Sequence, residues 1–212
     1  MEDYNVSNYE KTRRRAQLEF LKYDQQHMIE QFSLKHDDAY LYLHFVDATY
    51  RINRESGCTE RLCTDGNPER EAEAMEALSI WDVLCNSRPD AHISGTFGGK
   101  MSNTFKNTRV YDSDLLTQEL RFIDRNYELL EPVCAAIGTP IAGKGDLNFE
   151  FAAFDFLPVR FSYWESDDEF DACFKFYWDS NVEQFLHLET TYYVHDFIVH
   201  RLMELMGEAG AA

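Results

Sequence analysis

Hydrophobic residues recur with two different spacings along this chain, and the two spacings predict different structures. Apolar residues three and four positions apart predict helices, because one helical turn takes 3.6 residues. On this basis helices are predicted from Ser7 to about Phe32, after Asn67, after Ser113, and from Leu188 to Met206. Steps of two predict strands with one buried face, and they dominate the last third of the chain.

Capping and breaking residues set the expected limits of the helices. Ser7 and Glu10 form a capping box, in which each side chain satisfies a free backbone N–H group. Asn67-Pro68 is expected to begin the second helix, since proline at the first helical position loses no hydrogen bond. Pro132 is expected to kink or divide the third helix, and Gly207 to end the last one.

Two regions alternate in the way that antiparallel strands do. Tyr40 to Val46 and Thr49 to Asn53 flank a short turn and predict a β-hairpin. The aromatic-rich last third predicts a meander of three antiparallel strands. These strands are expected at Asn148 to Phe154, Pro158 to Glu165 and Ala172 to Asp179.

The elements together predict an α+β fold, in which an antiparallel sheet (meander plus hairpin) packs against several helices. A length of 212 residues suits a single domain over residues 1–212. Within it, residues 1–36 are expected to form an N-terminal helical extension. Residues 148–206 are expected to form the sheet meander and the C-terminal helix.

Charge narrows the classes of partner. The chain carries 38 acidic and 20 basic residues, a formal net charge of −18. Nucleic acids and anionic membrane surfaces both require clustered Lys and Arg, so neither is an expected partner. An acidic surface suits a basic protein partner instead. No stretch reaches the ~20 apolar residues of a membrane span and the N-terminus is acidic, so we expect a cytoplasmic protein.

The five cysteines give no metal-binding pattern. They are scattered and no C-x-x-C pair occurs. Four residues separate Cys58 from Cys63. This pattern favours reduced, independent thiols. A zinc site or cluster built from two or three of them remains the alternative, and the sequence predicts no particular cofactor.

The glycine-containing segment from His92 to Lys100 is the first candidate for ligand contact. Exposed amides and a lysine can hold an anion, although the spacing matches neither a P-loop nor a dinucleotide fingerprint. The aromatic residues around Trp164 and Trp178 are candidates for the floor of a pocket for a flat ligand. An ordered structural loop and an aromatic core are the alternatives. The candidate ligand-contacting residues are His92, Ser94, Gly95, Lys100, Trp164 and Glu189.

Two further groups of residues have metal-binding chemistry. Glu165 to Asp171 contains five carboxylates, which suit a hard cation; a solvated turn between strands is the simpler interpretation. His187, Glu189 and His195 are available as ligands if the final helix faces a cleft, but their spacing is not H-E-x-x-H. His195 on an apolar stripe is more typical of a hydrogen-bonded core residue.

Three stretches resemble an uncharacterised prokaryotic family, domain of unknown function 3786. They read ISGTFGGKMSNTF, LPVRFSYWESDDEF and FYWDSNVEQFLHLE. The resemblance implies an architecture and no established activity. Members come largely from anaerobes, and some have iron–sulfur or corrinoid-type neighbours, which implies anaerobic cofactor metabolism. The family's elements map to Gly95, Pro158, Trp164, Asp168-Glu169-Phe170, Asp179, and Leu186 with Glu189.

Three functional hypotheses follow from the sequence, and whether the chain is an enzyme stays open. The preferred one is a non-catalytic protein of anaerobic metabolism that binds a small molecule or cofactor or acts as an accessory protein. Its site is expected in a cleft between residues 92–100 and residues 164–189. The second is a metal-assisted enzyme, which requires Glu189, His187 or Asp168 to converge in one pocket. The third is an acidic protein-interaction module.

Overall fold

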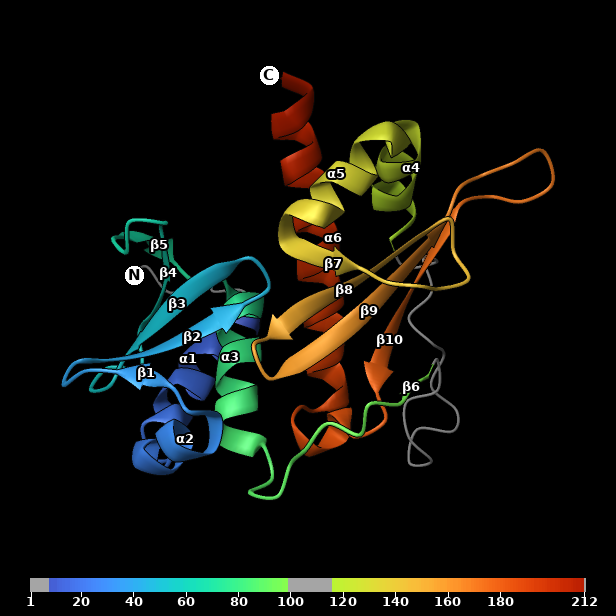
Figure 1. The fold of residues 1–212 in the computed structure, drawn as a ribbon. Helices are drawn as coiled ribbons and strands as arrows, with labels where there is room; N and C mark the ends of the chain where they lie inside the picture. The colour runs from blue at the N-terminus through green and yellow to red at the C-terminus, as the bar shows by residue number, and fades with distance from the viewer. Residues whose placement is uncertain (1–7, 99–115, 212) are drawn as a thin grey trace. The chain divides into compact units, whose positions relative to one another are not determined.

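The computed structural model describes residues 8–98 and 116–211, which form two compact units (Figure 1). Unit 1 comprises Met1–Ala91 and Gln184–Tyr193. Unit 2 comprises His92–Glu183 and Val194–Ala212. The long helix α6 (Leu188–Ala211) contributes its first residues to unit 1 and the remainder to unit 2. The single domain predicted over residues 1–212 stays a prediction.

Unit 1 contains antiparallel strands that follow each other in chain order. The predicted hairpin is confirmed: Tyr40 pairs with Asn53, and Phe45 pairs with Ala48. Leu41, Leu43 and Phe45 are buried on one face, as the alternation predicts. The strands are β1 (Lys35–His36), β2 (Tyr40–Phe45), β3 (Ala48–Asn53), β4 (Thr59–Leu62) and β5 (Pro68–Glu71).

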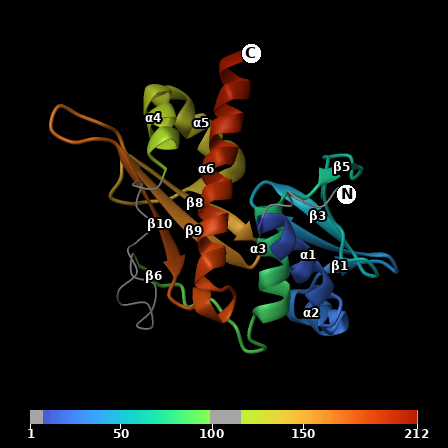
Figure 2. The same cartoon turned by 180° about the vertical axis from the view of Figure 1, so that it is seen from behind.

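The helices of unit 1 are α1 (Asn8–Phe20), α2 (Gln25–Phe32) and α3 (Ala74–Asn86). Figures 1 and 2 show α1 and α3 packed side by side against the β2–β3 hairpin. The single helix predicted up to Phe32 is therefore wrong, because the chain turns after α1. Asp24 then starts α2 by accepting hydrogen bonds from the backbone N–H groups of Gln26 and His27. Ser7, the predicted cap, lies outside the described residues.

The helix predicted to start at Asn67-Pro68 is also corrected. Pro68 begins β5, which lies at the end of the strand order. A proline suits that position as well, since a strand at the edge need not donate from every residue. Helix α3 begins later, where Glu73 and Glu76 form a capping box in which each side chain accepts from the other's backbone N–H.

Unit 2 contains the predicted meander, which is confirmed. Its strands are β6 (Phe97–Gly98), β7 (Gly138–Pro140), β8 (Leu147–Phe154), β9 (Leu157–Trp164) and β10 (Cys173–Asp179). They pair antiparallel in the order β7-β8-β9-β10-β6. The part of α6 in this unit runs across one face of β8, β9 and β10 (Figures 1 and 2). Buried aromatic rings of the meander form the core: Phe149, Phe151, Phe161, Phe174 and Phe176.

The helices of unit 2 differ from the prediction in their limits. Besides α6 they are α4 (Thr117–Arg125) and α5 (Tyr127–Ile137), and the short 3-10 helix η3 (Val182–Gln184) precedes α6. The division falls at Asn126, and Pro132 lies inside α5. Helix α6 also continues through Gly207. A glycine by itself lowers helix propensity, and it ends a helix where the backbone adopts a left-handed conformation, which Gly207 does not. Ser113, the predicted cap, lies outside the described residues.

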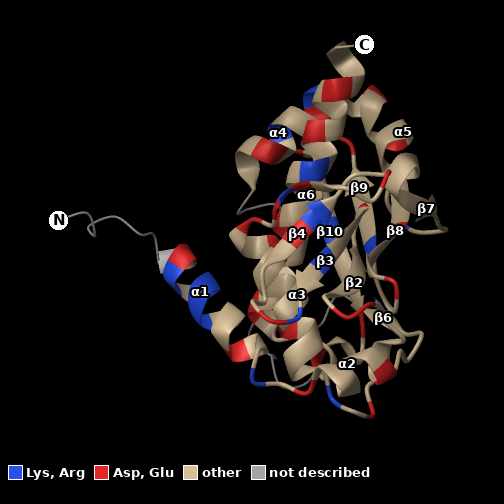
Figure 3. Cartoon of the chain, turned by 90° about the vertical axis from the view of Figure 1, so that its left-hand side faces the viewer, with Lys and Arg blue, Asp and Glu red and all other residues tan. Residues whose placement is uncertain are grey.

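The α+β class is confirmed by antiparallel strands and helices in both units, including the N-terminal helix α1. Helix α1 carries both basic and acidic residues along its length (Figure 3). Among the helices of residues 8–98 and 116–211, none has the length and apolar character that crossing a membrane would need.

Candidate functional site

The loop that precedes β6 holds a carboxylate of the chain itself. Asp179 accepts hydrogen bonds from the backbone N–H of Ser94 (3.0 Å), from its hydroxyl (3.0 Å) and from the N–H of Gly95 (2.8 Å). Burial raises the pKa of Asp179, but hydrogen bonds from Ser94, Asn181 and Gly95 outweigh it and lower that pKa below its usual value. Gly95 has φ of +76°, a conformation that glycine adopts readily. Asp179 thus occupies the position that an external anion would take.

Of the other predicted residues of unit 2, His92 lies beside this loop and Trp164 lies apart from it. The backbone carbonyl of His92 accepts a 3.0 Å hydrogen bond from the side chain of Asn181, beside Asp179. Trp164 ends β9 and pairs with Cys173, whereas the 92–98 loop meets the opposite end of β10. The two ends are separated by the length of the strand, on the order of 20 Å. Lys175 lies 5.7 Å from the ring centre of Trp164. Lys100 lies outside the described residues.

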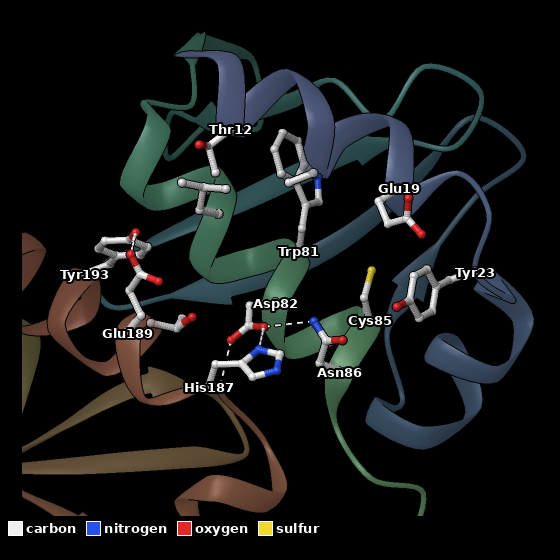
Figure 4. A pocket seen from close by; sticks show the side chains of 13 residues that line it. Thr12, Glu19, Tyr23, Trp81, Asp82, Cys85, Asn86, His187, Glu189 and Tyr193 are labelled. Carbon is white, nitrogen blue, oxygen red and sulfur yellow. Dashed lines mark hydrogen bonds and ion pairs between the residues drawn. The ribbon is translucent and has the colours of Figure 1, made fainter. Parts of the chain in front are cut away.

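A pocket of about 260 Å³ lies within unit 1. Side chains from α1, α3 and the start of α6 surround it (Figure 4). Glu189 is the predicted ligand-contacting residue that lines it, and His187 lines it as well. The lining residues are Thr12, Ala16, Glu19, Tyr23, Leu78, Trp81, Asp82, Cys85, Asn86, His187, Glu189, Thr190 and Tyr193.

Helical spacing explains which side chains meet in the pocket. Leu78, Trp81 and Cys85 recur at steps of three and four on α3, and therefore share one face of that helix. Thr12, Ala16 and Glu19 do the same on α1. The apolar side chains of these faces supply the floor, and the largest of them is Trp81, only 2% exposed. Tyr23 follows α1 and lies at the rim (Figure 4).

Asp82 makes three hydrogen-bonding contacts at the edge of the pocket. Its carboxylate lies 2.5 Å from Nδ1 of His187 and accepts a 2.9 Å hydrogen bond from that residue's backbone N–H. Asn86, one turn later on α3, donates to the same carboxylate at 2.9 Å. The side chain of Asp82 is 10% exposed and that of His187 is 67% exposed. Asp82 thereby ties α3 to the segment that leads into α6.

The remaining charges of the pocket are also negative. Glu189 accepts a 2.6 Å hydrogen bond from the hydroxyl of Tyr193, and Glu19 forms an ion pair with Lys22. The pKa of Cys85 is raised to about 12, by burial first and then by the charges of Asp82 and Glu19. That thiol is therefore protonated near neutral pH, so Cys85 contributes polarisable apolar surface.

Trp81 leaves one donor without an acceptor. Its Nε1 is buried and has no hydrogen-bond partner among the described residues. Buried N–H groups in folded proteins are nearly always paired, with protein, water or a ligand. The indole ring lies between α1 and α3, above Asp82 in the view of Figure 4.

Other candidates from the sequence lie elsewhere. Glu165 to Asp171 forms the exposed turn between β9 and β10, where Asp167 accepts from the N–H groups of Glu169 and Phe170. Asp168 is in this turn, in unit 2, whereas His187 and Glu189 belong to unit 1. Within residues 8–98 and 116–211, no group of three or more His, Cys, Asp or Glu side chains is arranged to hold a metal ion.

The sequence predicts a helix after Asn67, but for ligand contact it singles out none of the residues that α3 contributes to the pocket. A local signal for Asp82 exists, because Asp82 and Asn86 are four residues apart and therefore lie on the same side of a helix. The contribution of Glu19 and Tyr23 had no local signal, since it depends on how α1 packs on α3.

Comparison with known proteins identifies a family. No curated protein and no solved structure matches the chain. A family model described as "Domain of unknown function (DUF3786)" matches residues 24–201, which include α3, every strand of the meander and the segment that leads into α6. The chain belongs to this family of unknown function, as the resemblance in the sequence implied.

Proposed function

We propose that this protein binds a small molecule without transforming it, and that its site is the pocket of unit 1. The observation that carries this proposal is the convergence of an apolar floor and an ordered polar rim around one cavity of about 260 Å³. Ligand sites in proteins are typically concave, mostly apolar, and furnished with a few placed polar groups. Trp81 supplies the floor, and Asp82 with His187 supplies the rim.

The size of the pocket limits the ligand. Sites for drug-sized ligands measure roughly 300–1,000 Å³, so this pocket suits a smaller molecule. The polar rim is ordered before any ligand arrives, because Asp82 already has three hydrogen-bonding contacts from two segments. A preformed site loses less free energy to side-chain ordering when it binds.

An assignment to anaerobic metabolism extends this proposal, and so does a cytoplasmic location. The first is supported by the family resemblance, and the second by five scattered cysteines that are all free thiols. An accessory role in cofactor metabolism is also supported by the family resemblance. Of the residues predicted to contact ligand, Glu189 is the one retained in this site.

Filling the pocket tests the proposal. Ala16 lies on the face of α1 that lines the cavity, so Ala16→Phe should occupy the space. Leu18→Phe is the matched control, since Leu18 is on the same helix, outside the lining, and 64% exposed. The probes are single-ring aromatic fragments, including benzyl alcohol and benzylamine, and the readouts are melting temperature and tryptophan fluorescence.

Fragments that raise the melting temperature of the wild type and of Leu18→Phe should have no effect on Ala16→Phe. Circular dichroism checks that both variants are folded. The proposal fails if Ala16→Phe responds to the fragments as the wild type does, or if no fragment changes either readout in the wild type.

The contact between His187 and Asp82 favours a second candidate function, an enzyme that uses this pair for proton transfer. A carboxylate on one ring nitrogen fixes the orientation and tautomer of an imidazole and leaves Nε2 to exchange a proton. This candidate predicts that His187→Asn slows hydrolysis of p-nitrophenyl acetate at pH 7. His27→Asn, a change at another exposed histidine, should not. Equal rates for both variants would remove this candidate.

A further inference from the structure

Two of the three carboxylates that line the pocket have no Lys or Arg partner among the described residues. Glu19, Asp82 and Glu189 line it, and none of its described lining residues is Lys or Arg. Lys22 pairs with Glu19 from a position that is 67% exposed. Within the described residues, Asp82 and Glu189 have no Lys or Arg partner; Asp82 contacts His187, and Glu189 accepts from the neutral hydroxyl of Tyr193. A ligand with a negative charge would therefore be repelled.

The aromatic groups of the pocket suit a positive charge. Trp81, Tyr23 and Tyr193 each bring a ring to the lining. The face of an aromatic ring is negative, and indole attracts cations most strongly. Trp81 is almost wholly buried. A cation that binds beside it therefore loses contacts with water and gains contacts with the ring and with the nearby carboxylates.

The unpaired N–H of Trp81 is an independent observation that points to a ligand. It is buried, it belongs to a lining residue, and the described residues offer it no acceptor. A neutral oxygen on a ligand would satisfy this donor without adding negative charge. A carboxylate on the ligand would also satisfy it, but at the cost of repulsion from Asp82, Glu19 and Glu189.

We propose that the ligand of this pocket is a small organic cation, an ammonium or quaternary ammonium group on a short body that also carries a neutral oxygen. This inference rests on the proposed function, because it names the chemical class that the pocket binds. The carboxylates and the aromatic rings recognise the positive charge, and the indole N–H of Trp81 recognises the oxygen.

Choline and 3,3-dimethyl-1-butanol test the role of charge, because the second is the carbon isostere of the first and lacks only the positive charge. Glycine betaine tests the role of sign, because it carries an added carboxylate. Each probe is titrated by calorimetry and by tryptophan fluorescence at constant ionic strength. Choline should bind at least about tenfold more tightly than either other probe. In Trp81→Phe the fluorescence response to choline should disappear.

Charge-removing variants test whether choline is attracted by the carboxylates of the pocket or by the overall negative charge of the chain. Glu189→Gln and Asp82→Asn should each weaken choline binding severalfold and leave binding of 3,3-dimethyl-1-butanol unchanged. Glu30→Gln removes the same charge from an exposed position on α2, outside the lining, and should leave choline binding unchanged. A loss of affinity in Glu30→Gln equal to that in Glu189→Gln would overturn the local recognition.

The outcomes distinguish this inference from the proposed function. Equal affinity for choline and its neutral isostere would refute the cationic class and leave the pocket as a binding site. If choline does not bind but aromatic fragments do, and Ala16→Phe abolishes the response to the fragments, the cationic class is refuted and the pocket remains a binding site. Choline binding that Ala16→Phe does not change would refute the pocket itself.

Discussion

The indole Nε1 of Trp178 donates a 2.7 Å hydrogen bond to Nε2 of His195, which joins β10 to α6 inside unit 2. Phe176 stacks on the same imidazole, with 4.2 Å between ring centres and planes inclined by 8°. His195 is 2% exposed, and burial lowers its pKa to about 3. An imidazole that accepts a hydrogen bond at Nε2 must be unprotonated there. The sequence prediction of a hydrogen-bonded core histidine thus agrees with the structure.

This arrangement predicts that the protein loses stability as the pH falls below about 6.5. The unfolded chain takes up a proton at His195 near pH 6.5, whereas the folded chain resists it until about pH 3. Between these values the unfolded state binds more protons, so the free energy of unfolding rises with pH and falls on acidification. The contribution of His195 should be complete above pH 6.5 and decline by about 1 kcal/mol between pH 7 and 5.5.

Urea unfolding at pH 7.0 and 5.5 measures this change. His195→Gln should be less stable than the wild type at pH 7 but should lack this part of the pH dependence. His27→Gln, at an exposed position, should keep it. Identical pH slopes for the wild type and His195→Gln would show that His195 is not the group responsible.

Replacement of Glu76 should destabilise the protein strongly. Glu76 is 1% exposed, and it accepts hydrogen bonds from Arg70 at 2.6 and 2.8 Å and from the hydroxyl of Tyr50. Removing this carboxylate leaves the buried hydroxyl of Tyr50 without its acceptor, whereas Arg70 is 38% exposed and can be solvated, so the cost should be about 1.5–3 kcal/mol. Glu76→Ala should show this loss in urea unfolding. Glu19→Ala removes a carboxylate from an exposed pair with Lys22 and should cost at most about 1 kcal/mol.

The same substitution should have opposite effects at two glycines. A Cβ at Gly138 would lie 2.5 Å from a ring carbon of the buried Phe151, so Gly138→Ala should cost about 1–3 kcal/mol. Gly207 lies inside α6 with no atom within 4 Å of the added carbon, so Gly207→Ala should stabilise by about 0.5–1 kcal/mol. Thermal unfolding measures both. A destabilised Gly207→Ala would show that α6 ends before this residue.

Loss of Asp179 should release the loop before β6. Asp179→Ala removes the acceptor for two backbone N–H groups and the hydroxyl of Ser94, and hydrogen bonds to charged groups contribute about 1.5–3 kcal/mol each. Amide hydrogen exchange at residues 94–97 should therefore accelerate. Asp167→Ala alters a similar acceptor in the exposed β9–β10 turn and should leave that loop protected. Unchanged exchange in Asp179→Ala would contradict this role.

The sequence by itself determined the class of fold and most of its elements. Alternating aromatic residues predicted β8, β9 and β10, and the spacing around Tyr40 to Asn53 predicted the hairpin. Such patterns are reliable because they reflect which face of an element is buried, and they act over a few residues. Helix limits were predicted less well. Pro68 suits an edge strand as well as a first helical turn, and a residue's local chemistry does not choose between them.

Tertiary structure decided what the candidate site contains. Glu189 and His187 could be singled out from the sequence, but their neighbours Glu19 and Asp82 come from helices far away along the chain. Likewise, the N–H groups of Ser94 and Gly95 were recognisable as anion donors, yet only pairing of β6 with β10 brings Asp179 to them. Local spacing determines which way a side chain faces on its own element. Which other element it meets depends on burial of apolar surface between distant segments, and a local pattern does not encode that choice.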